Sequence, residues 1–192
     1  MNATHPDRSP QLPSSASHVL LERNRNHAAG CRAGRPALEP TLRVLILACA
    51  DHRADPTHVF ALAPNEAVVV RNPGGRVTES FIQSLAVLAT VAAIEGLAPG
   101  FELIVMHHTD CGLARLGGAP YANLLTAMFG NVGTAPHTVT DPETTVSEDI
   151  DVLRGNPFVP GTLVVSGLVY DTDTGRARFV VLPAPLSSGA TT

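Results

Sequence analysis

The stretch Arg-Val-Leu-Ile-Leu-Ala-Cys, residues 43–49, decides the fold of this chain. The residues after Arg43 are apolar without interruption, and Gly34, Pro36 and Pro40 break the chain before them. A short apolar run without polar alternation is typical of a β-strand that is buried on both faces. We therefore predict that residues 43–49 form a strand of a sheet that is covered by helices.

Strands and helices alternate along the rest of the sequence. We predict further strands at residues 67–70, 102–106, 162–170 and 176–182. We predict helices at residues 16–29, after Pro56, at 78–97, within 111–129 and at 141–154. The turn-rich segment 171–175 joins the last two strands as a hairpin. This pattern predicts an α/β fold of a single domain, with a mostly parallel central sheet, flanking helices and an antiparallel edge strand.

The length of 192 residues suits one domain, and apolar residues make up 44% of the chain, which is enough to form a core. We expect residues 1–40 to be an N-terminal extension with a short helix, residues 41–183 to form the folded domain, and residues 184–192 to be a loose tail. The helix predicted at 78–97 is apolar nearly all round. We therefore expect it to be buried between the sheet and another surface, such as a second subunit.

Composition and charge exclude several classes of function. The formal net charge is −4 and there is no basic tail, so we expect no nucleic-acid partner and no membrane partner. All 13 basic residues are arginine, which excludes lysine Schiff-base chemistry and a phosphate-loop lysine. The apolar stretch 85–94 is about half as long as a membrane span, and the first residues lack the pattern of a signal peptide. We therefore expect a cytoplasmic protein.

Two of the three cysteines follow predicted strands. Cys49 begins the element Cys-Ala-Asp-His-Arg after the first strand, and Cys111 lies with His108 in His-Thr-Asp-Cys-Gly after the third. Ligands of open parallel sheets bind outside the carboxyl ends of the strands, where the strand order reverses. These side chains therefore converge if the two strands are neighbours. Three cysteines are too few for a disulfide framework, and we expect Cys31 to have no role in the site.

Two thiolates and one imidazole form a three-ligand zinc set, which leaves the fourth position for water as in catalytic zinc sites. We predict that Cys49, His108 and Cys111 bind zinc. The two sulfur atoms must then lie within about 5 Å of each other, because Zn–S bonds are about 2.3 Å long. The alternative is a cysteine nucleophile. We disfavour it, because the spacing from Cys49 to Arg53 is too short for a phosphatase loop and a Cys–His hydrolase needs only one thiol.

Asp51 and Arg53 are two residues apart and share a direction if the segment is extended. A carboxylate beside a metal-bound water can orient that water, and a guanidinium can clamp the carboxylate and keep it ionised. The alternative is an ordinary salt bridge in a loop. Because the two residues lie close to Cys49 in the sequence, we favour the interpretation in which they orient a metal-bound water.

At these residues the sequence resembles the β-class carbonic anhydrases, and the resemblance covers about residues 42–182. It rests on Cys-x-Asp-x-Arg at 49–53, His-x-x-Cys-Gly at 108–112 and Arg-Asn-Pro-Gly at 71–74. The string His-His-Thr-Asp-Cys-Gly at 107–112 and Asn-Pro-Phe at 156–158 are similar to a bacterial subgroup of that family.

The resemblance implies reversible hydration of carbon dioxide to bicarbonate and a proton by a zinc-bound hydroxide. It implies that residues 41–183 are a zinc-binding catalytic domain, with Cys49, His108 and Cys111 as ligands. Asp51 and Arg53 then form the dyad beside the fourth position, and the backbone N–H of Gly112 is a candidate donor to bicarbonate. Asp51 is also the candidate fourth ligand in a resting form. The resemblance further implies a homodimer or a larger assembly, with the helix at 16–29 as a candidate for packing on the partner subunit.

Two positions differ from the usual family pattern, His52 and Pro73. His52 is a candidate proton shuttle, because its pKa suits transfer near neutrality, and a solvated loop histidine is the alternative. One rival function is hydrolysis of carbonyl sulfide or carbon disulfide on the same scaffold. Another is a non-catalytic, zinc-stabilised interaction domain. A dinucleotide-binding module is disfavoured, because no Gly-x-Gly-x-x-Gly follows the first strand.

Overall fold

A computed structural model of the chain describes residues 15–30, 37–97, 99–117, 121, 123–124, 127 and 138–187. The chain forms two compact units, Met1–Pro36 and Ala37–Thr192. In the first unit, helix α1 (Ala16–Gly30) confirms the helix predicted at 16–29, and its residues are all exposed. The second unit contains the sheet and the other helices.

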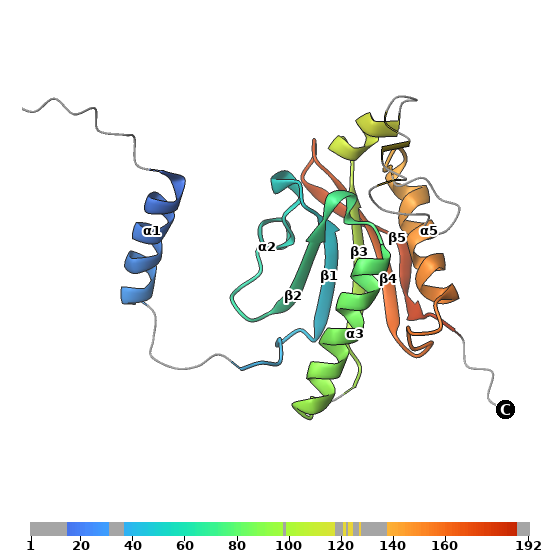
Figure 1. The fold of residues 1–192 in the computed structure, drawn as a ribbon, viewed down its shortest axis with the longest axis horizontal. Helices are drawn as coiled ribbons and strands as arrows, with labels where there is room; N and C mark the ends of the chain where they lie inside the picture. Colours follow the sequence, from blue (N-terminus) through green and yellow to red (C-terminus); the bar gives the residue numbers. More distant parts are fainter. Residues whose placement is uncertain are drawn as a thin grey trace, which may run out of the picture. The chain divides into compact units, whose positions relative to one another are not determined.

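The second unit is built on a five-stranded sheet with the strand order β2-β1-β3-β4-β5 (Figure 1). The strands are β1 (Val44–Cys49), β2 (Ala67–Asn72), β3 (Glu102–His108), β4 (Val164–Asp171) and β5 (Arg176–Pro185). β1 pairs in parallel with β2 and with β3, and β3 pairs in parallel with β4. β5 is antiparallel to β4. The predicted α/β class, the mostly parallel sheet and the antiparallel edge strand are therefore confirmed.

Capping residues fix the starts of the two long helices of this unit. The Thr78 hydroxyl accepts the backbone N–H of Phe81 at the start of α3 (Glu79–Ile94). The Asp141 carboxylate accepts the backbone N–H of Glu143 at the start of α5 (Pro142–Gly155), where proline occupies the first turn. The short helix predicted after Pro56 is present as α2 (Pro56–Val59), with Pro56 as its first residue. The predicted helix within 111–129 begins with a 3-10 turn, Gly112–Gly117, and most of the remainder lies outside the described residues.

The core has two layers, one on each face of the sheet. On one face, Leu45, Leu47 and Val105 pack with Phe81 of α3 and Ile150 of α5, so both helices cover this face (Figure 1). On the other face, buried residues of β1, β3 and β4 pack with Phe60 and Leu62, which follow α2. Every residue of β1 is buried, which confirms the prediction from its uninterrupted apolar run.

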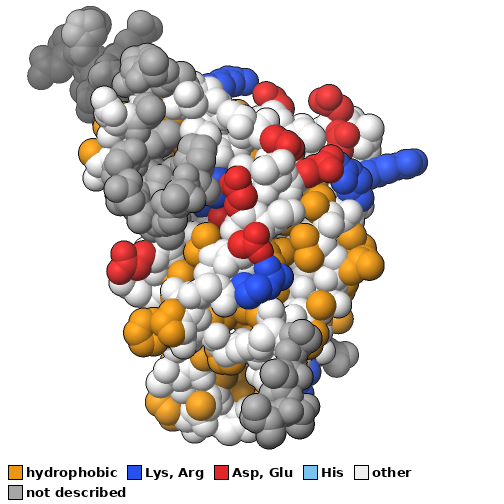
Figure 2. All heavy atoms as spheres, turned by 90° about the vertical axis from the view of Figure 1, so that its right-hand side faces the viewer, with side chains coloured by type: hydrophobic (Ala, Val, Ile, Leu, Met, Phe, Trp, Pro, Cys, Tyr) orange, Lys and Arg blue, Asp and Glu red, His pale blue; other side chains and the backbone are white. Residues whose placement is uncertain are grey.

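The last strand is longer than predicted. β5 runs to Pro185, which pairs with Val164 of β4, and the next residue, Leu186, is 5% exposed. The tail predicted for residues 184–192 therefore cannot begin at residue 184, because strand pairing and burial hold the chain there. β5 also exposes Phe179 and Leu182. Figure 2 looks at the side of the molecule that carries α5 and β5 and shows apolar side chains among acidic and arginine side chains.

Helix α3 is less buried within the chain than its composition predicts. Phe81 and Ile82 are its buried residues, whereas Val87, Val91 and Ile94 are exposed. The sheet therefore covers only the first turns of α3, and the second surface that we expected is not supplied by the described residues. Among those residues, no helix has the length and apolar character needed to cross a membrane.

Candidate metal centre

The strand order brings the predicted ligands to one edge of the sheet. β1 ends at Cys49 and β3 ends at His108, and the two strands are parallel neighbours. β2 lies on the other side of β1, so the strand order reverses at β1, where parallel sheets place their ligands. Asp110 has φ +52°, and this left-handed residue turns the chain so that Cys111 faces back toward Cys49. All three predicted ligands are buried.

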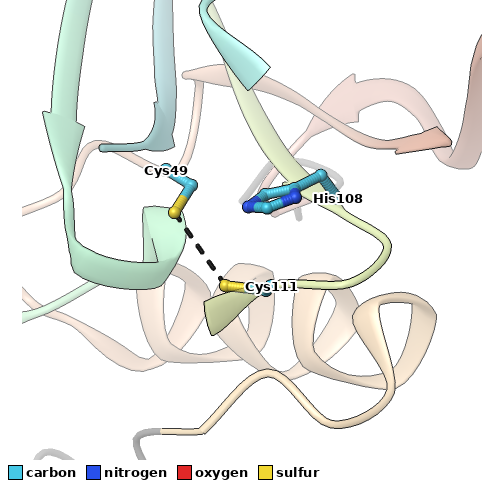
Figure 3. A group of neighbouring side chains, drawn as sticks. All are labelled: Cys49, His108 and Cys111. Atoms are coloured by element: carbon cyan, nitrogen blue, oxygen red, sulfur yellow. Dashed lines mark hydrogen bonds between the residues drawn. The ribbon is translucent and has the colours of Figure 1, made fainter. Parts of the chain in front are cut away.

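The distances fit a metal ion. The sulfur atoms of Cys49 and Cys111 are 3.9 Å apart, which is within the limit set from the sequence and too long for a disulfide. Tetrahedral zinc with Zn–S bonds of about 2.3 Å places two sulfurs about 3.8 Å apart. One ligand atom from each of Cys49, His108 and Cys111 lies within 4.8 Å of the others. Figure 3 shows the two sulfurs and the imidazole pointing into the same space.

The imidazole of His108 has one nitrogen in use and one without a partner. Nδ1 lies 2.8 Å from the carbonyl oxygen of Thr109, which can only accept, so Nδ1 carries the proton. Nε2 is buried and has no hydrogen-bond partner among the described residues. A buried polar atom without a partner is costly, and a backbone carbonyl on the other ring nitrogen is the usual arrangement for a metal-binding histidine. The donor set therefore fits a zinc ion.

The two cysteines shift each other's pKa in opposite directions. A hydrogen bond from the Cys111 thiol, helped by the neighbouring His108 side chain and by the backbone groups of Asp51 and Gly74, lowers the pKa of Cys49 to about 4, although burial opposes this. The same hydrogen bond and burial raise the pKa of Cys111 well above its ordinary value. Burial lowers the pKa of His108, but the neighbouring Cys49 thiolate offsets this and the net change is upward. A second negative charge 3.9 Å from the first is unfavourable unless a cation lies between the sulfurs.

Asp51 and Arg53 form the predicted pair. Nη2 of Arg53 lies 2.7 Å from Oδ2 of Asp51, and Nε lies 3.1 Å from Oδ1. The backbone N–H of Arg53 donates to Oδ1 as well, at 2.9 Å. These hydrogen bonds and the positive charge hold the pKa of Asp51 well below its usual range. The carboxylate is therefore ionised at the edge of the metal centre.

Sequence reasoning missed two residues that hold this pair in place. Asp110 accepts a hydrogen bond from Nη1 of Arg53 at 2.8 Å, and its position inside the string 107–112 was a signal that could have found it. Arg71 donates to the carbonyl oxygens of Cys49 and Asp51 at 2.9 and 2.7 Å. Arg71 was quoted only as part of a family segment. Its guanidinium fixes the turn that carries both Cys49 and Asp51.

An opening beside the centre is lined by Ala50, Asp51, His52, Arg53, Gly112 and Arg115. The predicted residues Asp51, Arg53 and Gly112 are thus brought together with the candidate shuttle. The side chain of His52 is 95% exposed, and its Nδ1 lies 3.8 Å from Oδ1 of Asp51. Cys31, for which we expected no role in the site, lies outside the described residues.

Comparison with known proteins gives a consistent result. A family model described as carbonic anhydrase matches residues 44–127. Beta-carbonic anhydrase 1 of Mycobacterium tuberculosis is 29% identical over 161 residues, which cover 83% of this chain and 94% of that protein. The carbon disulfide hydrolase of an Acidianus species is 25% identical over 165 residues, covering 71% of this chain and 76% of that protein. The crystal structure of a carbonic anhydrase from Streptococcus mutans superposes with a TM-score of 0.71 at 32% identity, covering 88% of this chain and 99% of that one.

Proposed function

Because the chain belongs to the β-carbonic anhydrase family, we propose that it catalyses the reversible hydration of carbon dioxide to bicarbonate and a proton. In this proposal Cys49, His108 and Cys111 hold a zinc ion. The observation that carries it is the pair of buried sulfurs 3.9 Å apart beside an imidazole nitrogen that has no hydrogen-bond partner among the described residues. Zinc held by three protein ligands acts as a Lewis acid and makes water a nucleophile near neutral pH.

The chain's own residues then bind and orient the reactants. The Asp51 carboxylate accepts a hydrogen bond from the attacking water and orients it toward the carbon of carbon dioxide. Arg53 keeps Asp51 ionised and in place through two parallel hydrogen bonds. The backbone N–H of Gly112, which lines the same opening, is the proposed donor to a bicarbonate oxygen. His52 is the proposed proton acceptor, since its exposed ring lies near Asp51 at the mouth of the opening.

A resting form remains part of the proposal. In it, Asp51 would break its hydrogen bonds to Arg53 and would serve as a further protein ligand of the ion. The structure has Asp51 paired with Arg53, so the resting form requires those hydrogen bonds to break. Crystal structures of the zinc-loaded protein at acidic and alkaline pH test this idea. A water in the fourth position with Asp51 and Arg53 still paired at both pH values would contradict it.

Hydrolysis of carbon disulfide or carbonyl sulfide is the second candidate, because a carbon disulfide hydrolase is among the relatives. The opening contains Arg53 and Arg115, whose positive charges suit the anionic product bicarbonate of carbon dioxide hydration. The deciding experiment measures zinc content, carbon dioxide hydration by stopped flow, and hydrogen sulfide release from carbon disulfide and carbonyl sulfide. Release of sulfide without hydration would favour the second candidate. Bound zinc with neither activity would favour a non-catalytic interaction domain.

Self-association, with residues 1–40 as an extension that packs on a partner and 41–183 as the catalytic domain, is also proposed. The exposed apolar residues Val87, Val91 and Ile94 on α3 support it, because burying them against a second copy removes apolar surface from water. Size-exclusion chromatography with light scattering measures the mass of the assembly and tests this proposal. A Val91→Asp substitution should shift it toward the monomer. A cytoplasmic location stays a prediction.

A further inference from the structure

A buried cluster of charged and polar side chains lies behind the metal centre and is not used in the proposed reaction. Arg76, His107 and Asp149 are 5%, 0% and 1% exposed. The Asp149 carboxylate accepts hydrogen bonds from the Arg76 side chain, from the backbone N–H of Val77 and from His107, all at 3.0 to 3.1 Å. Burying an ion pair contributes little net stability, because the cost of removing both charges from water offsets their attraction. The cluster is better explained as a set of hydrogen bonds that holds neighbouring backbone segments in position.

One side of the cluster fixes the end of β3. Nε2 of His107 lies 3.2 Å from the carbonyl oxygen of Gly75 and 3.1 Å from Oδ2 of Asp149. Both partners can only accept, so Nε2 carries a proton. Nδ1 lies 2.8 Å from the hydroxyl of Thr145 on α5. The ring is therefore held at both nitrogens, and His107 directly precedes the proposed ligand His108 on the same strand.

The other side of the cluster fixes the loop that touches Cys49. A Cβ atom at Gly75 would lie 2.8 Å from the backbone nitrogen of Cys49, so this loop and β1 are in close contact. The backbone of Gly74 lies near enough to Cys49 to help lower the pKa of its thiol. The same loop continues into Arg76 and Val77, which both donate to Asp149. One carboxylate on α5 thus holds the segments beside two of the three proposed ligands.

On the premise of the zinc site proposed above, we propose that Asp149 is a positioning residue of the metal centre. Its carboxylate orders the end of β3 through His107 and the loop 74–77 through Arg76 and Val77. The ligand atoms are then already in place before the ion binds, and they do not drift apart while it is bound. Loss of such supporting contacts weakens metal binding by about 10- to 100-fold in other metal sites.

Zinc release from the loaded protein to a chromophoric chelator tests this role. We expect Asp149→Asn to release zinc about 10- to 100-fold faster than the wild type. Thr145→Val removes the partner of His107 Nδ1 but keeps the Arg76–Asp149 pair, and it should release zinc about tenfold faster. Thr145→Ser restores the hydroxyl and should stay within about twofold of the wild type. The cobalt(II) forms of Asp149→Asn and Thr145→Val should show shifted sulfur-to-metal absorption bands, which general destabilisation does not produce.

The matched control is Ser166→Ala. Ser166 is fully buried and donates to Glu102 at the opposite end of β3. This variant should lose thermal stability yet release zinc within about twofold of the wild-type rate. Wild-type release rates and wild-type cobalt spectra for Thr145→Val and for a folded Asp149→Asn would overturn the inference. If Asp149→Asn does not fold, the zinc release rate and the cobalt spectrum of Thr145→Val alone test the inference. A wild-type protein that takes up no zinc would instead overturn the proposed function.

Discussion

Replacing Asp51 by Asn tests the central chemical step, because the change removes a charge and leaves the shape of the side chain nearly intact. The Asp51 carboxylate binds the Arg53 side chain at both oxygens. Asn has one oxygen and would place an NH2 group against the guanidinium, so the paired hydrogen bonds cannot form. A carboxylate positioned to act on the attacking water accelerates a reaction by about 100- to 10,000-fold. We therefore expect kcat/KM for carbon dioxide hydration to fall by that factor, or about 2.7 to 5.5 kcal/mol.

Zinc binding should survive the same substitution. Residue 51 contacts the Cys49 sulfur through its backbone N–H, which Asn keeps. Metal analysis should therefore find wild-type zinc content, while stopped-flow hydration is largely lost. The matched control is Asp110→Asn, which removes the outer carboxylate bound to Arg53. Because that pair is solvent-exposed, we expect a loss of less than about fivefold. Hydration within a few-fold of wild type in zinc-loaded Asp51→Asn would refute the reasoning, as would equal losses in both variants.

Three further predictions follow from the geometry. Cys49→Ser and His108→Ala should each lose zinc, measured by metal analysis after dialysis, because each removes one of three ligands. In the metal-free chain, the pKa of Cys49 is lowered to about 4. Between about pH 4 and the ordinary thiol pKa of 9.0, the folded state binds fewer protons than the unfolded state. Its free energy of unfolding, relative to Cys49→Ser, should therefore rise across this pH range, and a flat difference would contradict the lowered pKa. Gly75→Ala and Gly175→Ala both place alanine at positive φ, +68° and +69°. Gly175→Ala should lower the free energy of unfolding by about 1–2 kcal/mol. In chemical denaturation, Gly75→Ala should lower the free energy of unfolding by about 1–3 kcal/mol more than Gly175→Ala does. The reason is that a Cβ at residue 75 meets the Cys49 backbone, whereas a Cβ at residue 175 has no neighbour within 4 Å.

Local sequence features were enough to predict the elements of the fold. The apolar run that ends at Cys49 predicts a buried strand, and the caps Thr78 and Asp141 predict where α3 and α5 begin. Each of these signals acts within a few residues of the chain. The chemistry of the donor atoms is equally local, so the sequence also determines that two thiols and an imidazole are available at strand ends for a soft metal ion.

The tertiary structure decided what depends on contacts between distant residues. It placed β1 between β2 and β3, and without that order Cys49 and His108 would not lie on neighbouring strand ends. It extended β5 to Pro185, because the partner strand β4 sets how far the pairing continues. It also gave Asp149 its partner Arg76, 73 residues away in the sequence. Hydrogen bonds of this kind follow from how the chain connects its strands, which no local propensity encodes.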